Sequence, residues 1–165
     1  MKIAGILLII LLGWLVGREL KCRIKARHIL LCEIDMLCDR MIALMRFERL
    51  PLDRIIHRMK GKSAGFIRMC ADKIESGSDF HAAWEYSTNH SPDLRCLKPE
   101  EREDLRGLGQ SLGRSDLEGE ISLIEGYRSR LAPLREAAAE EIKTKGRALQ
   151  SCCLLAGIFL AIVMI

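Results

Sequence analysis

The residue types that most often carry out catalysis are present in this chain, but their spacing does not bring them together. No two histidines have the H-x-x-x-H spacing and no glutamate stands three residues before a histidine, so the histidine spacings of helical metal sites are absent. No serine is followed three residues later by a lysine. We therefore predict that the chain is not an enzyme and that it binds no metal or other cofactor. The histidines are His28, His57, His81 and His90.

Two patterns that resemble nucleotide or proton-transfer sites have simpler explanations. Gly61-Lys62-Ser63 matches the end of a phosphate-binding loop, but such a loop needs an earlier glycine where this chain has Ile56. The acid pairs Glu100-Glu101 and Glu140-Glu141 lie within four residues of basic side chains, which is typical of solvated helix faces. We interpret the first pattern as a helix end and the acid pairs as charged surface.

Cysteine usage indicates a reducing compartment. The chain has seven cysteines, an odd number, and no C-x-x-C motif. A cytoplasmic domain keeps its thiols reduced, so we expect most of them to fill apolar space inside the protein. They are Cys22, Cys32, Cys38, Cys70, Cys96, Cys152 and Cys153.

Uncharged, apolar segments stand at both ends of the chain. Ile3–Gly17 contains no charged residue, and a helix over residues 1–20 reaches about 30 Å, the thickness of a bilayer's hydrocarbon core. A cleaved signal peptide is the alternative, but Arg18 and Glu19 follow where a small-x-small cleavage motif would stand. We predict two transmembrane helices, at residues 1–20 and 148–165.

Basic residues beside the first segment predict the orientation of the chain in the cell membrane. The net charge is +4, and five of the 26 Lys and Arg residues directly follow this segment. Such an excess is typical of the cytoplasmic flank of a membrane span and of contact with membrane lipid. We therefore expect residues 21–147 in the cytoplasm and both termini on the other side. Because only 5% of residues are aromatic, we predict no nucleic-acid binding. The membrane-flanking residues are Arg18, Lys21, Arg23, Lys25 and Arg27.

Apolar residues recur every three or four positions through the middle of the chain, which predicts helices. A first helix ends near Phe47, and later helices begin near Pro51, Ala64, Ser78, Pro99 and Ser115. No stretch shows the two-residue alternation of a strand. The predicted fold class is all-α: an antiparallel helical bundle of about six helices at residues 21–147, flanked by the two terminal transmembrane helices.

Local signals set several of these helix boundaries. Ser78 is expected to cap the fourth helix, and Ser115 with Glu118 has the spacing of a capping box. Pro133 lies inside the last helical pattern, which resumes on its other side, so we expect a kink and no helix end.

The segment Leu105–Asp116, LRGLGQSLGRSD, is unusually rich in glycine for a helical region. Each interior glycine costs a helix about 1 kcal/mol relative to alanine, so something must favour these positions. Close approach of a neighbouring helix is one explanation, and a docking groove for a partner helix is the other. Trp84 poses the same choice between filling the core and anchoring a partner. The predicted partner-binding residues are Leu105, Leu108, Gly109, Leu112, Gly113, Ser115, Asp116 and Trp84.

Several motifs together resemble those of one family. They are the two apolar ends, Leu50-Pro51-Leu52, Ser76-Gly77 before Ala83-Trp84, and Leu108-Gly109 through Leu112-Gly113 with Ser115-Asp116. Over essentially its whole length the chain resembles the stage III sporulation protein AB family, which is related to F-type platform proteins of type II secretion and type IV pilus systems. The family pattern has a glutamine shortly after the Ser-Asp pair, whereas this chain has Glu118 and Glu120 there.

This resemblance implies a non-enzymatic membrane scaffold of a secretion-like channel, located in the mother-cell membrane around the forespore. The implied partners are a cytoplasmic hexameric ATPase of the same operon and other membrane proteins of the channel, and a homo-oligomer is compatible with this role. The residues alone leave an alternative open, which is a membrane-tethered sensor or adaptor whose cytoplasmic bundle binds a ligand or a regulatory protein.

Overall fold

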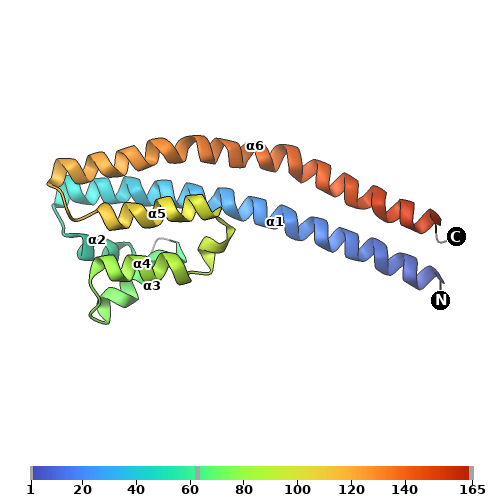
Figure 1. The fold of residues 1–165 in the computed structure, drawn as a ribbon, viewed down its shortest axis with the longest axis horizontal. Helices are drawn as coiled ribbons and strands as arrows, with labels where there is room; N and C mark the ends of the chain where they lie inside the picture. Colours follow the sequence, from blue (N-terminus) through green and yellow to red (C-terminus); the bar gives the residue numbers. More distant parts are fainter. Residues whose placement is uncertain (1, 62–63, 164–165) are drawn as a thin grey trace. The chain divides into compact units, whose positions relative to one another are not determined.

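The computed structural model describes the backbone at residues 2–61 and 64–163, and side chains at residues 15, 18, 19, 22–61 and 64–144. Helices joined by short connections account for the described backbone, which confirms the predicted all-α fold (Figure 1). The α-helices are α1 (Lys2–Ala43), α2 (Leu52–Met59), α3 (Gly65–Glu75), α4 (Phe80–His90), α5 (Pro99–Ser111) and α6 (Leu117–Val163). A π-helix, η1 (Leu44–Glu48), follows α1, and a short 3₁₀-helix, η2 (Asp93–Cys96), precedes α5.

The chain divides into two compact units. The first consists of residues 1–28 and 136–165, and the second consists of residues 29–135. Helices α1 and α6 contribute residues to both units, whereas α2 to α5 belong entirely to the second. The second unit contains most of the predicted helical bundle, including its glycine-rich segment, whereas residues 21–28 and 136–147 of that prediction fall in the first unit.

An ion pair joins α1 to α6 within the first unit. Arg27 Nη1 lies 3.0 Å from Glu141 Oε2, and the Arg27 side chain is 8% exposed. Arg27, predicted as a membrane-flanking residue, is thus buried beside a carboxylate. Arg18, Arg23 and Lys25 from the same set are exposed, and the side chain of Lys21 lies outside the described residues.

No helix in the described part of the chain is long and apolar enough to cross a membrane. The side chains of residues 1–14 and 145–165, which make up most of the two predicted spans, lie outside the described residues. The transmembrane helices at residues 1–20 and 148–165 therefore stay a prediction.

In the second unit, the first part of α6 runs antiparallel to the last part of α1 (Figure 1). Arg128 Nε donates to Asp35 Oδ1 at 2.9 Å, and Asp35 also pairs with Arg135. Burial raises the pKa of the Asp35 carboxyl, but hydrogen bonds and charges from the two arginines outweigh burial. The pKa of Asp35 consequently lies below its ordinary value.

The apolar positions predicted from the three- and four-residue spacing form the core of this unit. Helix α4 packs against α3 on one side and against α5 on the other (Figure 1). Helices α1 and α6 turn one apolar stripe each towards the interior, as their periodicity predicted. The fully buried members of these stripes include Leu31, Ile34, Cys38, Met41, Ile121, Ile124 and Leu131.

The capping residues of two helices each lie one position after the predicted ones. Asp79, and not Ser78, caps α4, because its carboxylate accepts the backbone N–H of His81 at 3.1 Å and of Ala82 at 3.3 Å. These two hydrogen bonds lower the pKa of Asp79. Asp116, and not Ser115, caps α6 by accepting the Gly119 N–H at 3.1 Å. Serine and aspartate cap equally well, so the course of the backbone decides between such neighbours.

Pro133 lies inside α6, which continues on both sides of it. The prediction that the helix does not end at this proline is confirmed. The expected kink stays a prediction.

Candidate docking site at the α5–α6 loop

Trp84 of α4 packs directly on Gly109 of α5. A Cβ atom at position 109 would lie 2.0 Å from Trp84 Cδ1, which is far inside the contact distance of two carbon atoms. Trp84 Nε1 donates to the Leu105 carbonyl oxygen at 3.0 Å, and the Trp84 side chain is buried. Close approach of α4 therefore explains the glycine at position 109. Of the two alternatives predicted for Trp84, filling the core is the one that the structure shows.

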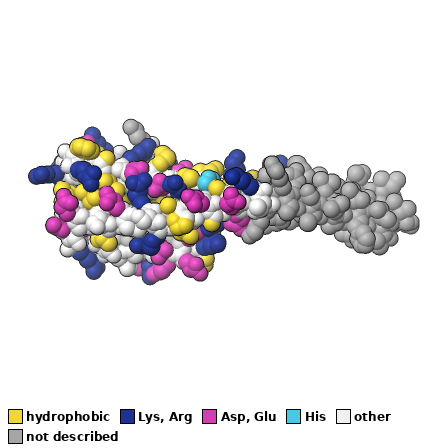
Figure 2. Space-filling view, turned by 90° about the horizontal axis from the view of Figure 1, so that it is seen from above, with side chains coloured by type: hydrophobic (Ala, Val, Ile, Leu, Met, Phe, Trp, Pro, Cys, Tyr) yellow, Lys and Arg dark blue, Asp and Glu magenta, His cyan; other side chains and the backbone are white. Residues whose placement is uncertain are grey.

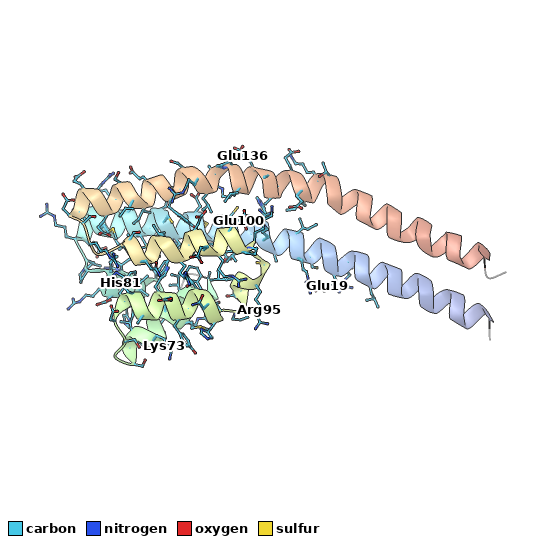
Figure 3. The ribbon with its side chains drawn as sticks, viewed as in Figure 1. Glu19, Lys73, His81, Arg95, Glu100 and Glu136 are labelled. Carbon is cyan, nitrogen blue, oxygen red and sulfur yellow. The ribbon has the colours of Figure 1, made fainter. Side chains whose placement is uncertain are left out.

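The chain turns at Gly113, directly after α5. Gly113 has φ +81°, a left-handed conformation that favours glycine and that commonly follows a helix. His81 lies at the start of α4 (Figure 3). It stabilises this turn, because its Nε2 lies 2.9 Å from the Leu112 carbonyl oxygen and donates a hydrogen bond to it. The end of α5 is thus tied to the beginning of α4.

Glu120, in the first turn of α6, holds the same loop from its other side. Its Oε1 accepts the backbone N–H groups of Gly113 at 2.8 Å, Arg114 at 3.0 Å and Ser115 at 3.0 Å. The Glu120 residue is only 7% exposed, and its Oε2 is buried with no hydrogen-bond partner among the described residues. A buried polar atom without a partner is rare in folded proteins and calls for an explanation.

A groove of about 510 Å³ lies beside this loop. Its lining comes from η1, from the segment leading into α2, from the first turns of α2, α4 and α6, and from the loop itself. The walls are mostly apolar and include Leu50, Leu52, Phe80 and Leu117. The groove therefore combines apolar walls with the start of three helices.

The groove carries net negative charge. Asp53, Asp79 and Glu120 line it, and the described lining includes neither lysine nor arginine. Each helix N-terminus acts as roughly half a positive charge, so the three helix starts supply about +1.5 against three carboxylates. The carboxylates outweigh the helix dipoles.

Phe47 is an exposed residue that stands two positions after Met45, which lines the groove. It is 83% exposed, more than any other large hydrophobic side chain that the structure describes. It belongs to η1, the π-helix that also contributes Met45 to the groove. This π-helix ends at Arg49, whose φ of 48° and ψ of 37° place a non-glycine residue in the left-handed region. Short π-helical segments often occur at functional sites, and this one turns an aromatic side chain to solvent.

The structure separates the predicted partner-binding residues into two groups. The buried group supports the loop from inside and comprises Trp84, Leu105, Leu108, Gly109 and Leu112. The exposed group lies on the loop and comprises Gly113, Ser115 and Asp116. Only the second group offers its own surface to a partner in this conformation.

Sequence reasoning missed Glu120, His81 and Phe47. Glu120 could have been found, because it stands four and seven residues before Ile124 and Tyr127 and so shares the buried face of α6. A carboxylate on such a stripe signals a specific hydrogen-bonding role. The contact of His81 with Leu112 spans 31 positions and has no local signal.

The described residues contain no group of three His, Cys, Asp or Glu side chains placed to hold a metal ion. Burial raises the pKa of the Cys38 and Cys70 thiols to about 12, so few of these thiols are ionised at neutral pH. Both cysteines are fully buried, as predicted, whereas Cys32 and Cys96 are half-buried and Cys22 is exposed, so the prediction that most cysteines fill apolar space holds for two of the five described. The groove itself offers non-covalent binding by apolar walls and carboxylates.

Fold and site together define an all-helical bundle with a carboxylate-lined groove at the loop between its last two helices. Residues 2–165 match the family described as stage III sporulation protein AB, and the chain belongs to that family. The family to which the sequence motifs pointed is thereby confirmed. Comparisons with curated proteins and with solved structures find no match to this chain. Figure 2 shows basic and acidic side chains interspersed over the described part of one face.

Proposed function

We propose that this chain is a non-enzymatic membrane platform of a sporulation-specific, secretion-like channel between mother cell and forespore. Its middle region lies in the cytoplasm and docks a hexameric ATPase, and both termini lie across the membrane. Membership of a stage III sporulation family supports the role in sporulation. The uncharged segments Ile3–Gly17 and 148–165 support membrane anchoring.

The docking proposal rests mainly on one observation: an exposed loop is held in a fixed conformation by hydrogen bonds. Residues 113–115 are exposed, yet Glu120 holds their backbone N–H groups and His81 holds the preceding carbonyl. A surface that is already ordered loses little conformational entropy when a partner binds. The neighbouring groove and Phe47 add the apolar area that interfaces concentrate at their centres.

Binding of the full-length chain, in detergent, to its cognate ATPase tests this proposal. Replacing an exposed aromatic anchor should weaken association by about ten-fold, so this is the expected effect of Phe47→Ser. Met36→Ser is the matched control, because Met36 is also an exposed apolar residue, at 51%, but lies on α1 away from the loop in sequence. If the unaltered chain does not bind the ATPase, or if the channel assembles in cells without the chain, the proposal is wrong.

The proposed orientation can be tested separately in intact, non-sporulating cells that express the chain in the cell membrane, where the far side of the membrane faces the medium. A single cysteine is introduced by Lys2→Cys or His90→Cys into a chain whose own cysteines are replaced. A thiol reagent that cannot cross membranes should label the first position and not the second. Labelling of both positions, or of position 90 alone, contradicts the orientation.

The volume of the groove also fits the second candidate, a membrane-tethered sensor or adaptor. About 510 Å³ is a size at which proteins bind small molecules. Native mass spectrometry of the purified full-length chain distinguishes the two functions. A stoichiometric small molecule that is lost in Leu52→Asp favours the sensor, and its absence together with ATPase binding favours the platform.

A further inference from the structure

Glu120 has one carboxylate oxygen that accepts several hydrogen bonds and one that accepts none from the described residues. Oε1 already accepts three backbone N–H groups, whereas Oε2 is buried without a donor. No lysine or arginine of the described residues pairs with Glu120, so a cation supplied from outside the chain would be bound favourably near this carboxylate.

The volume of the groove is much larger than that of a single bridging water molecule. One water takes up about 30 Å³, whereas the groove that Glu120 lines measures about 510 Å³. A whole side chain, with part of the segment that carries it, fits this volume.

The negative charge of the groove favours a cationic ligand. The carboxylates of Asp53, Asp79 and Glu120 outweigh the helix dipoles, and the described lining contains no lysine or arginine to neutralise them. Asp79 already accepts two backbone N–H groups and lies 3.5 Å from His81 Nδ1, whereas Asp53 makes no hydrogen bond or ion pair among the described residues. A cation is therefore favoured over a neutral donor and over an anion.

The apolar lining of the groove favours a cation that is attached to an aliphatic chain. Leu52, Phe80 and Leu117 present apolar surface beside the carboxylates. Lysine and arginine combine a cationic head with an aliphatic stem of three or four carbons, which is the combination that such walls accommodate.

We propose that the groove takes up one lysine or arginine side chain of the docked partner protein, with its stem on Leu52, Phe80 and Leu117 and its cation beside the carboxylates of Asp53 and Glu120. The inference rests on the proposed function for the existence of that partner. It adds the chemistry by which the partner is recognised.

A small probe tests the groove without the partner. n-Butylguanidinium reproduces the end of an arginine side chain, and pentanoate has a similar stem with the opposite charge. With the full-length chain in detergent, n-butylguanidinium should shift the NMR amide signals of Gly113, Ser115 and Leu117 saturably, at concentrations of about 1–50 mM. Glu120→Gln keeps an acceptor oxygen for the loop but removes the charge, and should weaken the probe at least about five-fold. Pentanoate binding as strongly as the cation, or an unchanged affinity in Glu120→Gln, overturns the proposal.

Glu118→Gln is the matched control, because Glu118 lies on the same helix, is exposed and does not line the groove. It removes the same charge and should leave the probe affinity within about two-fold. An equal loss in both variants would mean that general surface charge attracts the probe, and this too overturns the proposal.

Binding of the cognate ATPase separates the inference from the proposed function. If the ATPase binds and Glu120→Gln with Asp53→Asn weakens it at least about ten-fold, both are supported. If the ATPase binds equally well to this double variant, the inference fails and the function stands. If the ATPase does not bind but the cationic probe does, the function fails and the groove chemistry stands.

Discussion

Glu120 Oε1 accepts the backbone N–H of Gly113 at 2.8 Å, so a side chain at the start of α6 orders the loop that leads into the same helix. The same oxygen accepts two further backbone N–H groups, from Arg114 and Ser115. A single carboxylate thus fixes the direction of three consecutive peptide groups on an exposed surface.

Removing this carboxylate should loosen the loop. Glu120→Ala leaves three N–H groups without their acceptor and should lower the free energy of unfolding by about 1–3 kcal/mol. Glu120→Gln keeps an acceptor oxygen and should stay within about 1 kcal/mol of the unaltered chain. Chemical denaturation measures both values, and hydrogen exchange should accelerate at residues 113–115 in the alanine variant. Equal exchange rates in the two variants would show that Glu120 does not order the loop.

Two glycines of α5 should respond to alanine with opposite signs. At Gly109 the new methyl group would meet the Trp84 ring at 2.0 Å, so Gly109→Ala should destabilise the chain by about 2–3 kcal/mol. At Gly107 a methyl group meets nothing within 4 Å, so Gly107→Ala should stabilise the helix by about 0.5–1 kcal/mol. Thermal unfolding of the two variants measures the difference. A similar change at both sites would contradict the close packing of α4 on α5.

The Asp35 carboxylate should make the stability of the second unit sensitive to acid. Its pKa in the folded chain lies below the unfolded value of about 3.9, because burial is outweighed by Arg128 and Arg135. The stabilisation from a lowered pKa is present above the unfolded pKa and is lost as pH falls through the folded pKa. Asp35→Asn should therefore cost about 1–2 kcal/mol at pH 7 and flatten the loss of stability below about pH 4.

Asp39→Asn provides the control for this prediction. Asp39 also pairs with Arg128, but its side chain is 58% exposed, so its removal should cost less than about 0.5 kcal/mol. Denaturation at a series of pH values compares the two variants. If both give the same pH profile, the partly buried pair of Asp35 is not the source of acid sensitivity.

The left-handed conformation at Arg49 should be relieved by glycine. With φ 48° and ψ 37°, an L-residue other than glycine is strained by about 1 kcal/mol, so Arg49→Gly should stabilise the chain by about 0.5–1 kcal/mol. Arg46→Gly, in the same π-helix but outside the left-handed region, should destabilise it by a similar amount. Urea denaturation measures the change in the free energy of unfolding for each variant. A change of the same sign in both would refute the strain at Arg49.

Much of the fold could be predicted because its signals are local. Helices of the structure begin close to Pro51 and Pro99, because proline has a fixed φ angle and cannot continue a preceding helix. A helix ends close to Gly77, because glycine readily adopts a positive φ angle. The three- and four-residue spacing of apolar side chains identified the buried faces of α1 and α6 in the same way. The assignment of Ser78 and Ser115 as caps was one residue off, since each precedes an aspartate of equal capping strength.

The candidate site was predicted only in outline. The glycine-rich segment drew attention to the loop, but its leucines and Trp84 turned out to be its buried support. Phe47 escaped notice because a π-helical turn, and no feature of composition, places it in solvent.

The sequence by itself determined the order of the helices and their inward faces, because propensity, capping and periodicity act between residues a few positions apart. Only the tertiary structure decided that Trp84 rests on Gly109, that His81 holds Leu112, and that Glu120 lines a groove with one carboxylate oxygen unpaired. These relationships depend on how separate helices meet, and that geometry follows from the packing of the whole bundle.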